Sequence, residues 1–275
     1  MRIFGRISKL LLLSLLPLMA CGQGKDSLDL DEHIDWTYTD TLSVAHWNIG
    51  HFSLGRANDT AISGFQSDSL ASLYHAMLDT LNADILGVCE YNSSFNKSGG
   101  SARSIIFGDY PYFETGEQYS YNFNAIFSQI KLYDPHISIF EKCVQTRYFI
   151  DTTLKINDHS VRFIETHLDW NEGPDGADFR REQIRQLVDI YSKEPYVILC
   201  ADYNTDSGIE EFAPFLDAGF SLANPGGLTY PAAQPKSPLD NILTRGFIID
   251  TADIICNPGL SDHCLLRSRL IFIYD

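Results

Sequence analysis

The chain has 275 residues and a formal net charge of −16, from 20 basic and 36 acidic side chains. A protein this acidic is not suited to non-specific adhesion to DNA or to anionic lipid, because contacts with phosphate depend on Lys and Arg. A local basic patch or a bound metal can reverse the sign at one site, so the charge does not exclude a nucleic acid substrate.

The first residues of the chain predict export. Basic side chains precede an apolar run over residues 10–18, which is too short to span a bilayer and is typical of a signal peptide. The run ends in Leu18-Met19-Ala20-Cys21, which resembles the lipobox of bacterial lipoproteins, where the Cys carries the lipid. We therefore expect a lipid at Cys21 that anchors the protein in the bacterial cell envelope, at the periplasmic or surface face of the outer membrane. An ordinary secretory signal with an incidental Cys is the alternative.

Three segments follow from this interpretation. Residues 1–20 are the expected lipoprotein signal peptide, residues 21–40 an acidic tether, and residues 41–275 a single domain. Neither a linker rich in Pro, Gly and Ser nor an internal repeat divides the last segment.

Hydrophobic patterning predicts strands and helices in alternation along this domain. Helical spacing of apolar residues covers 69–81 and 178–191, and a short helix is expected at 209–216. Apolar or alternating runs predict strands at 42–48, 85–89, 121–128, 137–140, 147–156, 159–168, 196–200, 239–243, 247–255 and 265–273. Stretches 92–108 and 171–177 are rich in turn-forming residues and are expected to be loops.

Asp202 and Asn204 follow the apolar strand predicted at 196–200. They lie two residues apart, so both side chains leave on the same face if the strand geometry continues. A carboxylate and a carboxamide supply hard oxygen ligands and a hydrogen-bond donor, which suit a site for Mg²⁺, water and a phosphoryl oxygen. Both residues are also common where a chain turns after a strand, so a plain turn is the alternative.

Polar side chains of this kind recur where other predicted strands begin or end. The full set is Asn48, Glu90, His167, Asp202, Asn204, Asp240, Asp262 and His263. Ligands of α/β sheets bind at the carboxyl ends of strands, so one site would gather these carboxylates, amides and imidazoles. Together they provide oxygen ligands for Mg²⁺, a base for water and a cationic donor for phosphate, as metal-assisted phosphoryl chemistry requires.

The motifs around these residues resemble, in the same order, those of the endonuclease/exonuclease/phosphatase family. They are Trp47-Asn48-Ile49, Val88-Cys89-Glu90, Asn124-Ala125-Ile126-Phe127-Ser128, Thr166-His167-Leu168, Ala201-Asp202-Tyr203-Asn204, Leu239-Asp240-Asn241-Ile242 and Ser261-Asp262-His263. One motif alone is weak, whereas the ordered set covers the chain from residue 42 onward. Cys89, Ala201 and Asn241 depart from the residues usual in the family, and none of them replaces a reactive side chain.

This resemblance implies a fold and an activity. The fold is α/β, a four-layer sandwich in which two mixed β-sheets pack face to face and helices cover the outside. The activity is that of a phosphoric ester hydrolase that uses metal-activated water, with one or two Mg²⁺ or Mn²⁺ ions as cofactor.

The resemblance also implies how the metal and the water are held. Glu90 binds the metal ion, assisted by Asn48 and Asp262. Asp202 and Asn204 orient or deprotonate the attacking water and hold the second ion where two are bound.

Two histidines act on the phosphate group in the same scheme. His167 donates to a phosphate oxygen or to the leaving group, although a lone His beside apolar residues is more often structural. His263 contacts phosphate or takes the proton from water, and Asp240 holds its tautomer as a carboxylate orients an imidazole. Whether His263 or Asp202 is the base stays open.

The substrate is expected to be a phosphate ester: a lipid headgroup, a sugar phosphate or a nucleic acid. The acidic body and the lipid anchor favour the first two, and an exported nuclease is the alternative. A surface lipoprotein that keeps the fold only for binding is an alternative of another class. The membrane is a partner through the lipid alone, and no protein partner is implied. Arg147 is a candidate for a phosphate cleft, whereas Arg180, Arg181 and Arg185 are expected on the exposed face of helix 178–191.

The cysteines after Cys21 do not show the paired spacing of a zinc site. Cys89 and Cys200 lie in apolar strands and are expected to be small buried side chains. Cys143, Cys256 and Cys264 could include a disulfide, because the expected compartment is oxidising.

Overall fold

The computed structural model describes residues 38–52, 68–92, 101–116, 122–171, 173–205 and 208–274. The predicted signal peptide and Cys21 lie outside these residues. None of the described helices is long and apolar enough to cross a membrane.

The first sheet has six strands in the order β11-β12-β1-β2-β4-β3. The strands are β1 (Tyr38–Asn48), β2 (Ile85–Asn92), β3 (Tyr112–Thr115), β4 (Asn122–Ser128), β11 (Phe247–Ile255) and β12 (Leu265–Tyr274). β1 and β2 pair in parallel, and the other neighbours pair antiparallel, so the sheet is mixed.

The second sheet also has six strands, in the order β5-β6-β7-β8-β10-β9. The strands are β5 (Tyr133–Ile139), β6 (Tyr148–Ile156), β7 (His159–His167), β8 (Val197–Asp202), β9 (Ser221–Leu222) and β10 (Asp240–Arg245). Here β7 and β8 are the parallel pair, and the other neighbours are antiparallel.

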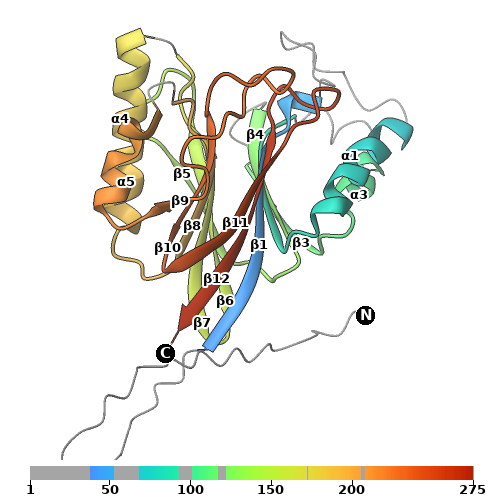
Figure 1. Cartoon of the computed structure of the whole chain (residues 1–275), viewed down its shortest axis with the longest axis horizontal. Coiled ribbons are helices and arrows are strands. Elements are labelled where there is room, and N and C mark those ends of the chain that lie inside the picture. Colours follow the sequence, from blue (N-terminus) through green and yellow to red (C-terminus); the bar gives the residue numbers. More distant parts are fainter. Residues whose placement is uncertain are drawn as a thin grey trace, which may run out of the picture.

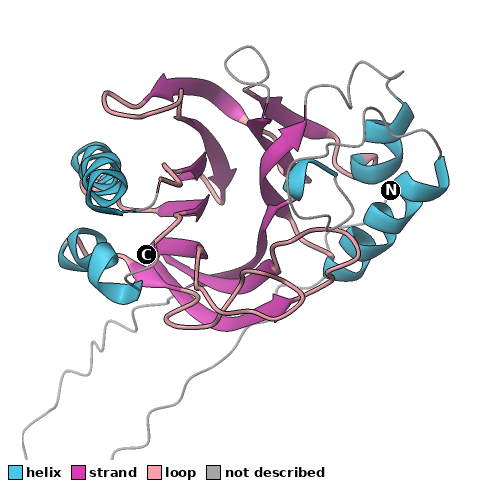
Figure 2. Ribbon diagram, turned by 90° about the horizontal axis from the view of Figure 1, so that it is seen from above, coloured by secondary structure: helices cyan, strands magenta, loops and turns pink. Residues whose placement is uncertain are grey.

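Helices lie on the outer sides of the two sheets (Figure 1 and Figure 2). The helices α1 (Asp68–Leu81) and α3 (Ser101–Phe107) flank the first sheet, and α4 (Gly173–Tyr191) and α5 (Ala213–Asp217) flank the second. Two 3-10 helices, η1 (Gly50–Phe52) and η2 (Gly208–Phe212), follow β1 and β8 along the chain. This order of layers confirms the predicted four-layer sandwich.

Strand β8 shows how the sequence produces these layers. Val197, Leu199 and Ala201 pack in one apolar cluster with residues of α4, and Ile198 and Cys200 pack in the other cluster with residues of both sheets. Successive side chains of a strand point to opposite faces, so a strand that is covered on both sides reads as a continuous apolar run. Asp202 follows Cys200 by two positions and therefore faces the space between the sheets.

Two of the predicted loops are partly wrong. Within the stretch 92–108, α3 forms over seven residues, too few to show a helical period in the sequence. It is held by packing, since Ile106 and Phe107 are buried and the ring of Phe107 stacks on that of Phe127 with centroids 3.8 Å apart. Within the stretch 171–177, α4 already begins at Gly173.

The predicted exposure of Arg180 is wrong, because this residue is 4% exposed. Its Nε lies 3.2 Å from Oε2 of Glu211, and its Nη1 donates to the carbonyl oxygens of Asp169 and Asn171. A buried cation needs such partners. They come from segments outside the helix, so the helical period could not reveal them.

Candidate active site

Strand register brings three of the predicted residues side by side. His167 ends β7 and pairs with Asp202, which ends the parallel neighbour β8. Asp240 begins β10 and pairs with Asp202 in antiparallel register. Asn48 ends β1 in the other sheet and reaches Asp202 across the space between the sheets. The candidate site therefore lies where strand ends of both sheets meet.

Asp202 is the centre of this group and is 1% exposed. Its Oδ2 accepts a hydrogen bond of 2.8 Å from Nδ2 of Asn48, and it lies 3.5 Å from Nε2 of His167 and 3.7 Å from Nε2 of His263. Its Oδ1 accepts a hydrogen bond of 2.9 Å from the backbone N–H of Asn204. Burial, and next the charge of Asp240, raise the pKa of Asp202 to about 6. A carboxylate with this pKa is a suitable general base near neutral pH.

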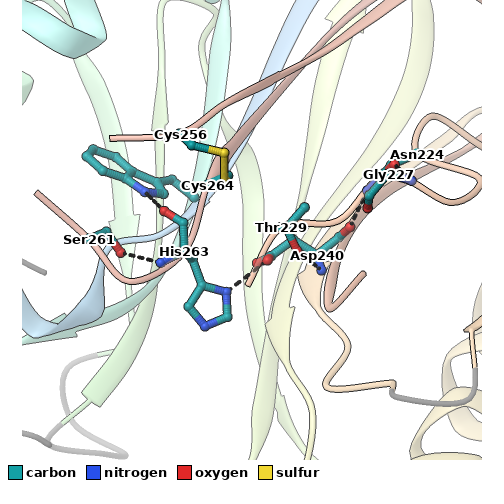
Figure 3. The surroundings of a disulfide bond; sticks show 9 residues. Asn224, Gly227, Thr229, Asp240, Cys256, Ser261, His263 and Cys264 are labelled. Atoms are coloured by element: carbon teal, nitrogen blue, oxygen red, sulfur yellow. Dashed lines mark hydrogen bonds and ion pairs between the residues drawn. A yellow bond between two sulfur atoms is a disulfide. The ribbon is translucent and has the colours of Figure 1, made fainter. Parts of the chain in front are cut away.

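His263 and Asp240 form a buried pair, drawn in Figure 3. The ring Nδ1 lies 2.8 Å from Oδ2 of Asp240. Burial alone would lower the pKa of His263, but Asp240 and then Asp202 outweigh it and raise the pKa to about 10. In turn, His263 outweighs burial and holds the pKa of Asp240 well below its usual range. The imidazole is therefore a cation in this arrangement, which suits contact with a phosphate group.

The loop that carries His263 is fixed at several points. Ser261 donates a hydrogen bond of 2.7 Å to the carbonyl oxygen of Asn48, and its hydroxyl accepts one of 3.1 Å from the backbone N–H of His263. Trp47 donates from its indole to the carbonyl oxygen of His263. A disulfide joins Cys256 to Cys264 and closes this loop (Figure 3). These contacts fix the position of the backbone that carries the imidazole of His263.

Glu90 lies at a bulge of β2, where the pairing with β4 shifts between Val88 and Tyr91. Its φ is 54°, a backbone conformation that is uncommon outside Gly. The bulge therefore interrupts the regular alternation of side chains along β2 at Glu90. Its Oε2 lies 2.8 Å from Nε2 of His51. Burial alone would raise the pKa of Glu90, but His51 outweighs it and holds the pKa well below its usual range.

Asp262 and Asn48 meet at Gly50, which has a φ of 57°. The backbone N–H of Gly50 donates to Oδ1 of Asn48, and a Cβ at this position would lie 2.8 Å from Oδ1 of Asp262. Only Gly fits here without moving the carboxylate. Burial, and to a smaller extent the charge of Glu90, raise the pKa of Asp262 although His263 opposes them.

This donor set fits a divalent cation. Carboxylate and amide oxygens are the ligands that Mg²⁺ prefers, and Glu90, Asn48 and Asp262 provide them on one side of the site. The pKa values of Asp202 and Asp262 are raised by crowded, buried negative charge, which a cation would relieve. Ligand atoms of Asp202, Asp240 and His263 also lie within 4.8 Å of one another.

His167 is a different kind of imidazole from His263. Burial, and next the positive charge of Arg147, hold its pKa well below the usual value. It is therefore neutral at pH 7 and can donate a hydrogen bond but is not an acid. The Nε of Arg147 is buried and has no hydrogen-bond partner within the described part of the chain. By contrast, Arg181 and Arg185 pair with Asp178 and Glu182 on α4.

Asn204 follows Asp202 with a φ of 52°, so the extended geometry does not continue beyond the strand. Its side-chain Nδ2 donates to the carbonyl oxygen of Leu168 at 3.0 Å. The predicted common face of Asp202 and Asn204 is therefore replaced by a turn in which the backbone of Asn204 holds the Asp202 carboxylate.

Several residues of the site were not predicted from the sequence. His51 contacts Glu90, and the ring of Tyr230 lies 4.7 Å from that of His263. His46 and Glu165 lie directly behind the site, with Nδ1 of His46 3.2 Å from Oε2 of Glu165. Both precede a predicted site residue by two positions in a strand, and this period of two is the signal that could have found them.

Residues 45–263 match the Endonuclease/Exonuclease/phosphatase family. The chain belongs to this family. No curated protein matches the chain.

Solved structures of the endonuclease/exonuclease/phosphatase family have the same fold. A family protein from Bacteroides thetaiotaomicron is 15% identical, with a TM-score of 0.66 over 85% of this chain and 98% of the other. TDP2 from D. rerio, complexed with a single-strand DNA product, is 17% identical, with a TM-score of 0.66 over 84% and 98%. A mannosyl-6-phosphatase from B. thetaiotaomicron VPI-5482 is 16% identical, with a TM-score of 0.62 over 84% and 100%. At these identities the likeness shows the fold alone.

Membership of the endonuclease/exonuclease/phosphatase family supports a phosphoesterase or nuclease. The structure gathers the eight predicted polar residues at one end of the sandwich, whereas Cys21 lies outside the described residues. Hydrogen bonds and close charge contacts join Asn48, His167, Asp202, Asp240 and His263 directly. The individual roles remain predictions.

Proposed function

We propose that the protein is an exported, lipid-anchored and Mg²⁺-dependent hydrolase of phosphoric esters. The observation that carries the proposal is the convergence on Asp202 of Asn48, His167 and the His263–Asp240 pair. A base, a neutral donor and a buried cation within one site are what the hydrolysis of a phosphate ester requires.

The pKa values favour a division of roles. Asp202, with a pKa of about 6 in the metal-free protein, takes the proton from water, whose oxygen forms the new bond to phosphorus. The ester P–O bond breaks as this bond forms, and the alcohol leaves with a proton from solvent. His263 is protonated and contacts the phosphate group, where it offsets the negative charge that develops. His167 is neutral and donates to a phosphoryl oxygen. Glu90, Asn48 and Asp262 would hold the Mg²⁺, which neutralises charge on the phosphate oxygens when bound.

An assay with a panel of phosphate esters would identify the substrate class. The full chain, purified in mild detergent, is tested with Mg²⁺ and with EDTA on supercoiled plasmid, bis(p-nitrophenyl) phosphate, a phospholipid and hexose 6-phosphates. Asp202→Asn should lower turnover by about a hundredfold or more, and Asp250→Asn, an ion-paired carboxylate at the surface, should not. Equal turnover of parent and Asp202→Asn would refute the proposed site.

A nuclease is the second candidate, because TDP2 of the same fold is complexed with a single-strand DNA product. Nicking of plasmid by the parent and not by Asp202→Asn would establish it. Turnover of hexose phosphates without nicking would instead favour the chemistry named for the mannosyl-6-phosphatase. If the parent turned over no ester and bound no Mg²⁺ by calorimetry, the domain would be a binding module.

The disulfide between Cys256 and Cys264 supports the export part of the proposal, since disulfides persist in oxidising compartments. Lipid attachment at Cys21 is tested by growing the expressing bacterium with radiolabelled palmitate. Label on the parent and its loss in Cys21→Ala are expected, with the unmodified variant recovered from the soluble fraction. Label that persists in the variant would exclude Cys21.

A further inference from the structure

A second polar layer lies behind the candidate site, between the two sheets. His46 precedes Asn48 by two positions in β1, and Glu165 precedes His167 by two in β7, so each pair of side chains points to one face of its strand. Both His46 and Glu165 are 0% exposed. The apolar core between the sheets is therefore interrupted by an imidazole and a carboxylate next to the reacting groups.

The two residues reach the site through Asp240. His46 lies between two carboxylates, with Nδ1 3.2 Å from Glu165 Oε2 and Nε2 3.4 Å from Asp240 Oδ1. The other oxygen of Asp240 is the one that binds His263, at 2.8 Å. A continuous chain of contacts thus runs from Glu165 through His46 and Asp240 to His263.

Nothing else in the described chain orients the inner oxygen of Asp240. Neither Asp240 Oδ1 nor His46 Nε2 makes a hydrogen bond with any described residue, so each is the other's polar neighbour in a buried place. An isolated buried carboxylate oxygen is costly, and the nearby imidazole lowers that cost.

The backbone of the first sheet makes room for this layer. Gly87 in β2 faces Glu165, and a Cβ at Gly87 would lie 1.9 Å from Oε2 of that residue. No other amino acid can stand at this position while Glu165 keeps its contact with His46. The strand gives up a packing side chain in the core, which is destabilising by itself. The carboxylate is therefore accommodated by a specific feature of the neighbouring sheet.

We propose that His46 and Glu165 are positioning residues for catalysis. They fix the orientation of the Asp240 carboxylate, so that its outer oxygen stays aligned with Nδ1 of His263. Their contribution passes through Asp240 and does not involve contact with substrate. The inference rests on the proposed hydrolase function.

The kinetic test uses His46→Gln and Glu165→Gln in the full chain, on the best ester of the panel. Loss of such an outer contact should lower kcat by about 10- to 100-fold and leave KM within about threefold. In an Asp240→Asn background the same substitutions should lower kcat less than about threefold, because they act through that carboxylate. Equal losses in both backgrounds, or no loss in the parent, would overturn the proposal.

A control separates positioning from general damage to the core. Asp151 is another buried carboxylate of the second sheet, and it accepts hydrogen bonds from Tyr191 and Arg162. Asp151→Asn should lower the unfolding temperature without changing kcat. If it lowered kcat as much as Glu165→Gln does, the effect of the latter would be structural and the proposal would fail.

A spectroscopic readout keeps the proposal testable where no substrate is found. The Nδ1 proton of His263 in its short contact with Asp240 should give a downfield proton NMR signal, assigned by its loss in His263→Gln. Glu165→Gln should move or broaden this signal, and Asp151→Asn should not. A signal unchanged in Glu165→Gln would overturn the positioning role, whatever the panel of esters shows.

Discussion

Asn48 and Asp202 are joined by a hydrogen bond of 2.8 Å, although they end strands in different sheets. The bond ties the two halves of the sandwich together at the candidate site. The amide nitrogen of Asn48 holds the proposed base, and its amide oxygen accepts from Gly50 on the side where Asp262 lies. One side chain therefore links the water-activating part of the site to the proposed metal ligands.

Asn48→Ala should lower kcat by about 10- to 100-fold, the range typical when a supporting contact of a site is removed. The loss has two physical causes, because Asp202 loses its donor and the metal loses a neighbouring amide oxygen. Steady-state kinetics at several Mg²⁺ concentrations separate them. A loss that saturating Mg²⁺ fully restores would show that Asn48 serves the metal alone.

Glu90→Gln should weaken the binding of Mg²⁺ by at least about tenfold, because it removes a full negative charge from the hard-oxygen ligands. Isothermal titration calorimetry of protein treated with EDTA measures this change directly. Glu114→Gln is the control, since Glu114 lies in β3, away from the site residues. Unchanged affinity in Glu90→Gln would place the ion elsewhere in the site.

The stability of the metal-free protein should depend on pH through His263. The pKa of His263 is about 10 when folded, above the usual value of about 6.5. Its stabilising contribution is therefore complete below pH about 6.5 and is lost as the pH rises through about 10. Urea unfolding in EDTA should show a fall in the free energy of unfolding over this range, and a smaller fall in His263→Gln. Cys and Tyr side chains also ionise in this pH range, so the free energies of unfolding of parent and variant are compared at each pH. If the pKa of His263 were unperturbed, the difference between the two free energies would stay constant.

The disulfide between Cys256 and Cys264 closes a loop that contains Ser261, Asp262 and His263. Closing a loop of this length stabilises a fold by about 2 to 3 kcal/mol in the chain-entropy model. Replacing both cysteines by Ser should lower the free energy of unfolding by about that amount and lower kcat several-fold. Cys143→Ser, which removes a free thiol, is the control and should do neither. If kcat stayed at the parent value, the remaining hydrogen bonds would suffice to place His263.

The sequence predicted well what its local patterns specify. Asp202 and His263 were found because each stands in a short motif, and the strand that ends at Asp202 reads as a continuous apolar run. The contact of His51 with Glu90 and the burial of Arg180 were not predicted. Each depends on a partner, Glu90 or Glu211, that lies far away in the chain. Periodicity reports which face of an element is buried but not what that face meets. The polar layer of His46 and Glu165 needed both sheets in place before it could be recognised.

Arg147 should contribute to the binding of phosphate. Its charge lowers the pKa of the neighbouring His167, and its Nε lies buried without a hydrogen-bond partner in the described residues. A guanidinium can bind phosphate oxygens through its terminal Nη groups even where its Nε is buried. Arg147→Gln should raise KM about tenfold with kcat within about threefold, because the contact is equally present before and during the reaction.

Arg147→Lys should restore little of the lost affinity for substrate, since an ammonium lacks the planar fork of a guanidinium. Arg185→Gln, at an exposed ion pair on α4, is the matched control. A change in kcat alone would instead mean that Arg147 acts on the transition state, through His167 or directly.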